Sequence, residues 1–218
     1  MNPVYLITGS QGPFMTFLVK YLLEQNAQVW APPGQPEAQI IPPKGTEEAF
    51  HPLAQIPRTP LAARALMLDF KNNQRTLDYH LHIYNPAVQG KSLGEISATV
   101  IDQNIDTSIK GLVFPLRESL TYMLAQESGS VALVILGGMN TIFPPLQSIG
   151  YGAVQEVGRS LFSLYQNEGI AVRGFQAPAD VDYGLYLDYI SSVLRENTGK
   201  TRGRWNKFSG KTGLFGLR

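Results

Sequence analysis

The sequence has no cysteine, few charged residues and no long hydrophobic run, and each shortage excludes a class of protein. Without cysteine the chain can have no disulfide framework, no thiol nucleophile and no cysteine-ligated zinc site. No run approaches the ~18 consecutive apolar residues of a membrane-spanning helix, and no charged segment precedes an apolar stretch at the N-terminus. We therefore expect a soluble, cytoplasmic protein that does not bind membranes.

Charged residues make up only 16% of the 218 residues, below the usual share of about 25%. Much of the surface must therefore be neutral or apolar, which favours association with partners or with other copies. Hydrophobic residues make up 44%, enough for a sizeable core, and the length favours a single domain spanning residues 1–218. The net charge of +1 fits neither a wholly basic nucleic-acid binder nor a strongly acidic protein.

Basic residues are concentrated in a C-terminal tail. Residues 197–218 hold six basic side chains and no acidic one, whereas the preceding residues carry a net charge of −5. Trp205 and Phe208 lie among these cations, a combination that can stack on bases and neutralise phosphates. The tail can equally be a terminal strand or an arm docked on another subunit. Because the rest of the chain is acidic, we expect docking or disorder rather than nucleic-acid binding.

Prolines are concentrated in residues 32–60, which contain eight of the 15 in the chain. Each proline lacks a backbone donor and restricts the residue before it, so no long helix fits here. We interpret the segment as an extended excursion between regular elements.

Apolar periodicity predicts strands that alternate with helices. Short apolar runs predict six buried strands, at 3–8, 28–31, 65–70, 81–84, 130–136 and 170–175. Helical spacing of apolar residues predicts four helices, at 14–25, 104–126, 151–167 and 182–196. Such alternation is typical of parallel sheets with right-handed crossovers. The sequence therefore predicts an α/β fold, a doubly wound parallel sheet with helices on both faces that is Rossmann-like.

A glycine-rich loop, TGSQG at 8–12, follows the first predicted strand. Gly9 and Gly12 would let the backbone approach a pyrophosphate at the N-terminus of the next helix. The dinucleotide fingerprint is incomplete, because Phe14 stands where a third small residue is wanted and its ring could fill the phosphate site. The second predicted strand ends at Ala31 without the acid that would bind a ribose. A nucleotide loop and a plain strand-to-helix turn both remain open.

Several short motifs follow one another along most of the chain: TGSQG at 8–12, LDF at 68–70, YNPA at 84–87, SVALVILGG at 130–138, YGAVQ at 151–155 and IAVRGFQAP at 170–178. In their order and spacing they resemble the motifs of the short-chain dehydrogenase/reductase family. The resemblance implies a Rossmann-like fold, an NAD or NADP cofactor and hydride transfer by an Asn–Ser–Tyr–Lys group. By position it also implies cofactor contacts from Gly9, Ser10, Gly12, Asp69 and Asn85.

Of the four catalytic residues that the resemblance implies, only Tyr151 is present. The lysine's place, four residues later, is Gln155, and the serine's place, 13 residues before the tyrosine, is Gly138. The asparagine's place falls on Ser108, with Asn104 one turn earlier. Gln155 can hydrogen-bond but brings no charge, and loss of a positioned acid–base group costs ~10²–10⁴ in rate.

These departures leave several functions open. The first is a degenerate short-chain-dehydrogenase-like protein that has lost hydride transfer and acts through binding or oligomeric assembly, with either no cofactor or NADP/NAD. The second is a divergent NADP(H)-dependent carbonyl reductase with Tyr151 as proton donor and Gln155 replacing part of the lysine's role. A third is a sensor that holds a nucleotide without chemistry. We favour the first, because the serine, the lysine and the ribose acid are missing.

The helices at 104–126 and 151–167 are the predicted assembly surfaces, because the corresponding helices of the family pack against their copies. We expect a homo-oligomer, or a hetero-oligomer with an intact relative. The apolar stripes that suggest this are Leu112, Leu116, Leu120 and Met123 on the first helix, and Val154, Leu161 and Leu164 on the second.

His80 and His82 flank Leu81 at strand spacing, share one face and could ligate a metal. With no cysteine and no acidic cluster beside them, we expect a surface or hydrogen-bonded pair and no metal site.

Overall fold

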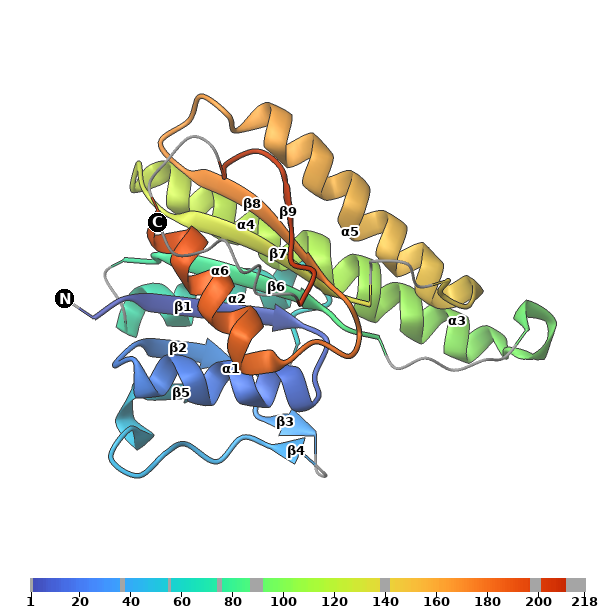
Figure 1. Ribbon diagram of the computed structural model, residues 1–218, viewed down its shortest axis with the longest axis horizontal. Helices are drawn as coiled ribbons and strands as arrows, with labels where there is room; N and C mark the ends of the chain where they lie inside the picture. Colours follow the sequence, from blue (N-terminus) through green and yellow to red (C-terminus); the bar gives the residue numbers. More distant parts are fainter. Residues whose placement is uncertain are drawn as a thin grey trace.

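A seven-stranded parallel sheet runs through the computed structural model, which describes residues 2–35, 38–54, 56–73, 76–86, 92–137, 142–196 and 201–210 (Figure 1). The strand order is β5-β2-β1-β6-β7-β8-β9, and every neighbouring pair is parallel. In chain order the strands are β1 (Val4–Gly9), β2 (Gln28–Ala31), β5 (Phe50–Pro52), β6 (Tyr79–Tyr84), β7 (Ser130–Leu136), β8 (Ala171–Ala177) and β9 (Trp205–Lys207). The order reverses beside β1, so the expected doubly wound sheet is confirmed.

Helices cover both faces of the sheet (Figure 1). One face is covered by α1 (Pro13–Glu24) and α6 (Tyr183–Arg195), and the other by α2 (Pro60–Asn73), α4 (Gly111–Ala125) and α5 (Pro145–Leu164). A shorter helix, α3 (Ala98–Ile105), runs through the π-helical turn η3 (Asp106–Lys110) into α4. The remaining short elements are β3 (Gly34–Gln35), β4 (Ala38–Gln39), η1 (Glu47–Ala49) and η2 (Leu93–Glu95).

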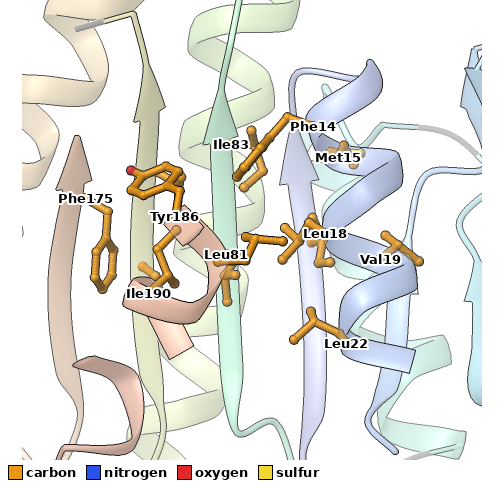
Figure 2. Packing of buried hydrophobic residues seen from close by; sticks show 14 of the residues in the cluster. Phe14, Met15, Leu18, Val19, Leu22, Leu81, Ile83, Phe175, Tyr186 and Ile190 are labelled. Atoms are coloured by element: carbon orange, nitrogen blue, oxygen red, sulfur yellow. The ribbon is translucent and has the colours of Figure 1, made fainter. Parts of the chain in front are cut away.

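The core has two layers, because successive side chains of a buried strand point to opposite faces of the sheet. Leu81 and Ile83 of β6 point toward α1 and α6, where Leu18 of α1 and Tyr186 of α6 contact them in one buried cluster (Figure 2). Alternate residues of the central strands pack on α2, α4 and α5 in a second cluster. This burial on both faces explains why β7, at the centre of the sheet, is apolar at every position after Ser130.

The predicted strand at 65–70 is wrong, because these residues lie in helix α2. Ala63, Met67 and Phe70 are its buried side chains, and their spacing of four and three is helical. A short apolar run does not distinguish a strand from a buried helix. The strand that the sheet uses there, β5, lies inside the proline-rich segment and has no apolar run of its own.

The two long predicted helices begin earlier than periodicity indicates. The first begins at Ala98 and passes through the π-helical turn, instead of beginning at residue 104. The second, α5, begins at Pro145, six residues before Tyr151, because a proline at the first helical position costs no hydrogen bond. Tyr151 therefore lies two turns inside α5 and not at its start.

The apolar stripe predicted for association on the first helix packs against the protein's own sheet, which corrects that assignment. All four of its residues are buried in the second core cluster, as is Val154 of α5. Of the three stripe residues on α5, Leu164 alone is well exposed, at 67%. A stripe at helical spacing faces the nearest apolar surface, and here that surface is the sheet.

The part of the basic tail that the structure describes docks on its own sheet and not on another subunit. Trp205 begins strand β9, which pairs with β8 in parallel. Its indole occupies a slot where a Cβ on Gly174 would lie 2.3 Å from the ring and one on Gly158 2.7 Å. Phe208 continues the docking by stacking on Tyr186, with ring centroids 5.5 Å apart. The expectations for residues 197–200 and 211–218 lie outside the described residues.

Within the described part of the chain, no helix has both the length and the apolar character needed to cross a membrane.

Candidate functional site

The loop that joins β1 to α1 is attached to the end of β6 at the carboxyl edge of the sheet. The backbone N–H of Ser10 donates to the Ile83 carbonyl at 2.8 Å, and the Asn85 N–H donates to Ser10 Oγ at 3.0 Å. Gly9 has φ 102°, and a Cβ there would lie 2.1 Å from the Ile83 oxygen. Three of the predicted cofactor residues, Gly9, Ser10 and Asn85, are therefore in one place.

Gly12, the fourth, faces open space at the start of α1. Its φ is 149°, and a Cβ there would meet nothing within 4 Å. The Phe14 ring, which from the sequence could fill this space, lies in the core at 1% exposure, edge-on to Tyr183 with centroids 5.2 Å apart. Its helical position directs it toward α6 (Figure 2). The first-turn N–H groups of α1, which have no intrahelical acceptor, are thus not covered by this ring.

A pocket of about 380 Å³ lies beside the loop, between Gln11 and the segment that leads into α2. Its other lining residues are Ile56, Arg58, Thr59 and Ala62. Thr59 caps the helix, since the Ala62 N–H donates to Thr59 Oγ1 at 3.1 Å. Arg58 is exposed, and among the described residues no carboxylate lies within 4 Å of its guanidinium. This arrangement suits a phosphate group.

Sequence reasoning missed Arg58 because it placed the third strand at 65–70. In folds of this kind, an arginine near the end of the second strand is the usual signal for a phosphate group. In the structure, Arg58 follows β5, the strand that lies beside β2. Asp69, in contrast, lies on the exposed side of α2, with its Oδ1 accepting from Asn73 Nδ2 at 3.1 Å. It follows no strand and does not line the pocket beside the glycine loop.

The second half of the site is centred on Tyr151. Gln155, one turn further along α5 and buried, donates from Nε2 to the Tyr151 hydroxyl at 3.3 Å. The Phe143 ring, 8% exposed, lies 5.2 Å from the Tyr151 ring and 6.3 Å from that of Tyr84, centroid to centroid. A Cβ on Gly137 would be 3.3 Å from Phe143, so this ring covers the end of β7. Phe143 stands in no motif, and only the fold reveals it.

Ser108 and Tyr84 converge on Gly150, next to Tyr151. A Cβ on Gly150 would lie 2.7 Å from the Tyr84 hydroxyl and 2.9 Å from Ser108 Cβ. The Tyr84 hydroxyl donates to the Gln147 carbonyl, and burial raises the pKa of Tyr84.

Asn104, on α3, has a buried amide oxygen, Oδ1, for which the described residues provide no hydrogen-bond partner. The position of the family's serine, Gly138, lies outside the described residues. The described polar side chains named here, those of Gln155, Tyr84 and Ser108, are neutral and can hydrogen-bond a ligand.

Replacing Gly150 and Gly152 by alanine should have opposite effects on stability. Gly150→Ala forces a methyl group into Tyr84 and Ser108, and we expect a loss of about 1–3 kcal/mol in the free energy of unfolding. Gly152→Ala meets nothing within 4 Å and should gain about 0.5–1 kcal/mol, since alanine is the better helix former. Urea unfolding of both variants measures the difference. Equal stability would show that α5 does not approach Tyr84 this closely.

The two histidines of β6 lie in the core and not on the surface. The Thr8 hydroxyl bridges them, at 2.9 Å from His80 Nε2 and 3.0 Å from His82 Nδ1. His80 Nδ1 also contacts Ser119 Oγ at 2.6 Å. Burial lowers the pKa of both rings to about 3, so both are neutral at pH 7. The pair is hydrogen-bonded as expected, and the described residues contain no group of three metal-ligating side chains.

Comparison with known proteins finds solved structures with the same fold. No family model and no curated protein matches this sequence. Solved structures match over nearly the whole chain. ElxO with NADP bound has a TM-score of 0.76 at 14% identity, covering 96% of this chain and 98% of that chain.

Two short-chain dehydrogenases match equally well. One, from Leptospira borgpetersenii serovar Hardjo-bovis with bound NAD⁺, has a TM-score of 0.76 at 12% identity, covering 96% of this chain and 92% of its own. The other, from Bacillus anthracis, has a TM-score of 0.77 at 10% identity, with coverages of 99% and 98%. The chain thus has the Rossmann-like fold of these short-chain dehydrogenase structures.

Proposed function

We propose that this protein is a non-catalytic, short-chain-dehydrogenase-like protein that acts through binding or assembly, and that it holds an adenine dinucleotide, NADP or NAD, at the glycine loop. One observation carries the loss of hydride transfer: the Tyr151 hydroxyl is paired with the neutral amide of Gln155. In the family that this sequence resembles, a lysine stands there and supplies a positive charge. An amide cannot replace that charge.

The adenine and phosphate half of such a cofactor fits the residues present. Gly12 leaves open space over the start of α1, where backbone N–H groups attract phosphate. The pocket beside it ends at Arg58, whose charge suits a further phosphate group such as the one that distinguishes NADP from NAD. Such a cofactor supplies a hydride in enzymes, whereas in this proposal these residues would only hold its phosphates.

The nicotinamide half fits less well. Phe143 covers the end of β7 and packs on Tyr151, so an apolar ring lies beside the Tyr151 ring. The neighbouring polar groups, Gln155 and Ser108, are neutral. At the position of the family's lysine, Gln155 brings no positive charge to an acid–base step at Tyr151. Loss of a positioned acid–base group costs ~10²–10⁴ in rate.

The alternative is a divergent NADP(H)-dependent carbonyl reductase with Tyr151 as proton donor. It is favoured by the position of Tyr151 at the carboxyl edge, where its hydroxyl already has a hydrogen-bond donor in Gln155. It is favoured too by the NADP and NAD⁺ in structures of the same fold. The two functions differ in turnover and not in binding.

A thermal-melt series with NADPH, NADP, NADH and NAD tests binding. At a hundredfold excess over Kd a ligand adds about 2.7 kcal/mol, which for a chain of this size raises Tm by about 5–10 °C. We expect an upshift that is larger for the phosphorylated cofactors, and loss of that preference in Arg58→Gln. Arg64→Gln, which removes an exposed charge on α2 outside the pocket, is the control. No shift with any cofactor would contradict nucleotide binding.

Turnover decides between the two functions. NADPH oxidation with a panel of ketones and aldehydes should stay at the background rate in this proposal, with no difference between wild type and Tyr151→Phe. Turnover that Tyr151→Phe abolishes would establish the reductase instead. If neither binding nor turnover is seen, light scattering shows whether the chain acts through assembly.

A further inference from the structure

Arg173 is a buried cation near the amino end of β8. It is 2% exposed, and three of its N–H groups reach neutral acceptors: Ser130 Oγ at 2.9 Å, the Glu196 carbonyl at 3.2 Å and Thr201 Oγ1 at 3.4 Å. Within the described ranges no carboxylate oxygen lies within 4 Å of its guanidinium. Because burial of an unpaired charge is costly, such arginines are almost always paired with an anion.

Two further arginines gather around it. Arg195, in the last turn of α6, and Arg202, on the segment before β9, line one pocket of about 350 Å³ together with Arg173. Burial and the nearby charge of Arg202 lower the pKa of Arg173. Three arginines therefore line one pocket, and the charge of Arg202 repels that of Arg173.

The acidic groups nearby do not balance this charge. Asp78 is the one carboxylate among the pocket's lining residues, and its Oδ2 accepts from the Val4 N–H at 2.8 Å. Three arginines against one aspartate leave the lining with a net charge of +2. Glu196 acts on Arg173 electrostatically but does not line the pocket. The pocket therefore attracts anions.

We propose that this pocket, at the amino edge of the sheet and on the opposite side from the glycine loop, binds a phosphate group. A guanidinium offers paired donors in a plane that match phosphate oxygens, and several together bind it strongly. A volume of about 350 Å³ lies at the small end of ligand pockets, so it accommodates free phosphate or a small phosphate ester.

A purely structural role explains only part of this arrangement. The bond from Arg173 to the Glu196 carbonyl satisfies the end of α6, as basic residues often do at helix C-termini. It does not explain why Arg195 and Arg202 line the same cavity. A structural arginine makes stability independent of anions, whereas a phosphate site makes it rise with phosphate concentration.

Calorimetric titration of the full chain with inorganic phosphate and with glycerol 3-phosphate tests the proposal. Ionic strength is held constant with sodium chloride, so that general screening does not contribute. Arg195→Gln and Arg202→Gln alter groups outside the buried core, and each should weaken binding about tenfold. Arg159→Gln on α5 makes the same charge change at an exposed site outside this pocket and should leave binding unchanged.

Arg58→Gln separates this site from the glycine loop. It should leave phosphate binding intact, and Arg195→Gln should leave the nucleotide-induced melting shift intact, so the two proposals fail independently. Tighter binding of glycerol 3-phosphate identifies an ester as the ligand, and equal binding identifies free phosphate; either supports the site. The proposal is overturned by wild-type protein that binds neither probe, or by unchanged affinity in both pocket variants.

Discussion

Lowering the pH from 7 to 5 is expected to reduce the free energy of unfolding by about 4 kcal/mol through two histidines in the core. Burial lowers the pKa of His80 and His82 to about 3, whereas an unfolded histidine titrates near 6.5. At pH 5 the unfolded chain therefore binds two protons that the folded chain does not bind. The contribution of the two neutral rings to the free energy of unfolding is present above about pH 6.5 and is lost as the pH falls toward 3. By pH 5 the loss is about 2 kcal/mol per histidine.

Urea unfolding between pH 7 and pH 5 measures this loss. His80→Gln and His82→Gln each remove one of the two protons, so each should halve the pH dependence whatever it does to stability at pH 7. His51→Gln is the comparison variant: His51 is only half-buried and hydrogen-bonded to Gln28, and burial lowers its pKa as well, so its removal should reduce the pH dependence less than either core substitution. An unchanged pH dependence in both core variants would show that the rings become protonated without unfolding.

Replacing Gly9 by alanine should be the most damaging single methyl addition in the glycine loop. The new Cβ would lie 2.1 Å from the Ile83 oxygen and 2.8 Å from its nitrogen, and both atoms belong to the backbone of β6. They can move only by opening the pairing of β1 with β6, and the φ of 102° disfavours any side chain. We expect a loss of about 3–5 kcal/mol in the free energy of unfolding.

Gly94→Ala is the matched control, since a Cβ there meets nothing within 4 Å, and it should change stability by less than about 0.5 kcal/mol. Chemical denaturation compares the two variants, and the cofactor melts described above show whether Gly9→Ala also loses nucleotide binding. Gly9→Ala as stable as Gly94→Ala would mean that the loop does not rest on β6 in this way.

The central strands were predictable because a strand that is buried on both faces is rich in apolar residues. Strand β7 is buried on both faces at all seven positions, so it reads as an uninterrupted apolar run. Strand β5 was not predictable, because its three residues include a histidine and a proline and it lies at an edge of the sheet. The same ambiguity placed Asp69 in a strand when its neighbours Met67 and Phe70 pack as a helix.

Some residues of the candidate site were also predictable from the sequence, and others were not. The glycine loop was predictable, with Gly9, Ser10 and Gly12, because a short glycine-rich loop between a strand and a helix has few structural or binding roles. Arg58 and Phe143 were not, because neither stands in a recognisable motif. Their role depends on which loops meet at the carboxyl edge, and that follows from the strand order.

By itself, the sequence determined the class of fold, the glycine loop and the neutral residue beside Tyr151, because apolar period and residue type are local properties. The tertiary structure alone decided that Phe14 leaves the loop open, that the tail completes the sheet and that three arginines share one pocket. These outcomes depend on contacts between residues distant in sequence. Arg173 and Arg202 are separated by 28 residues and meet only because β9 pairs with β8.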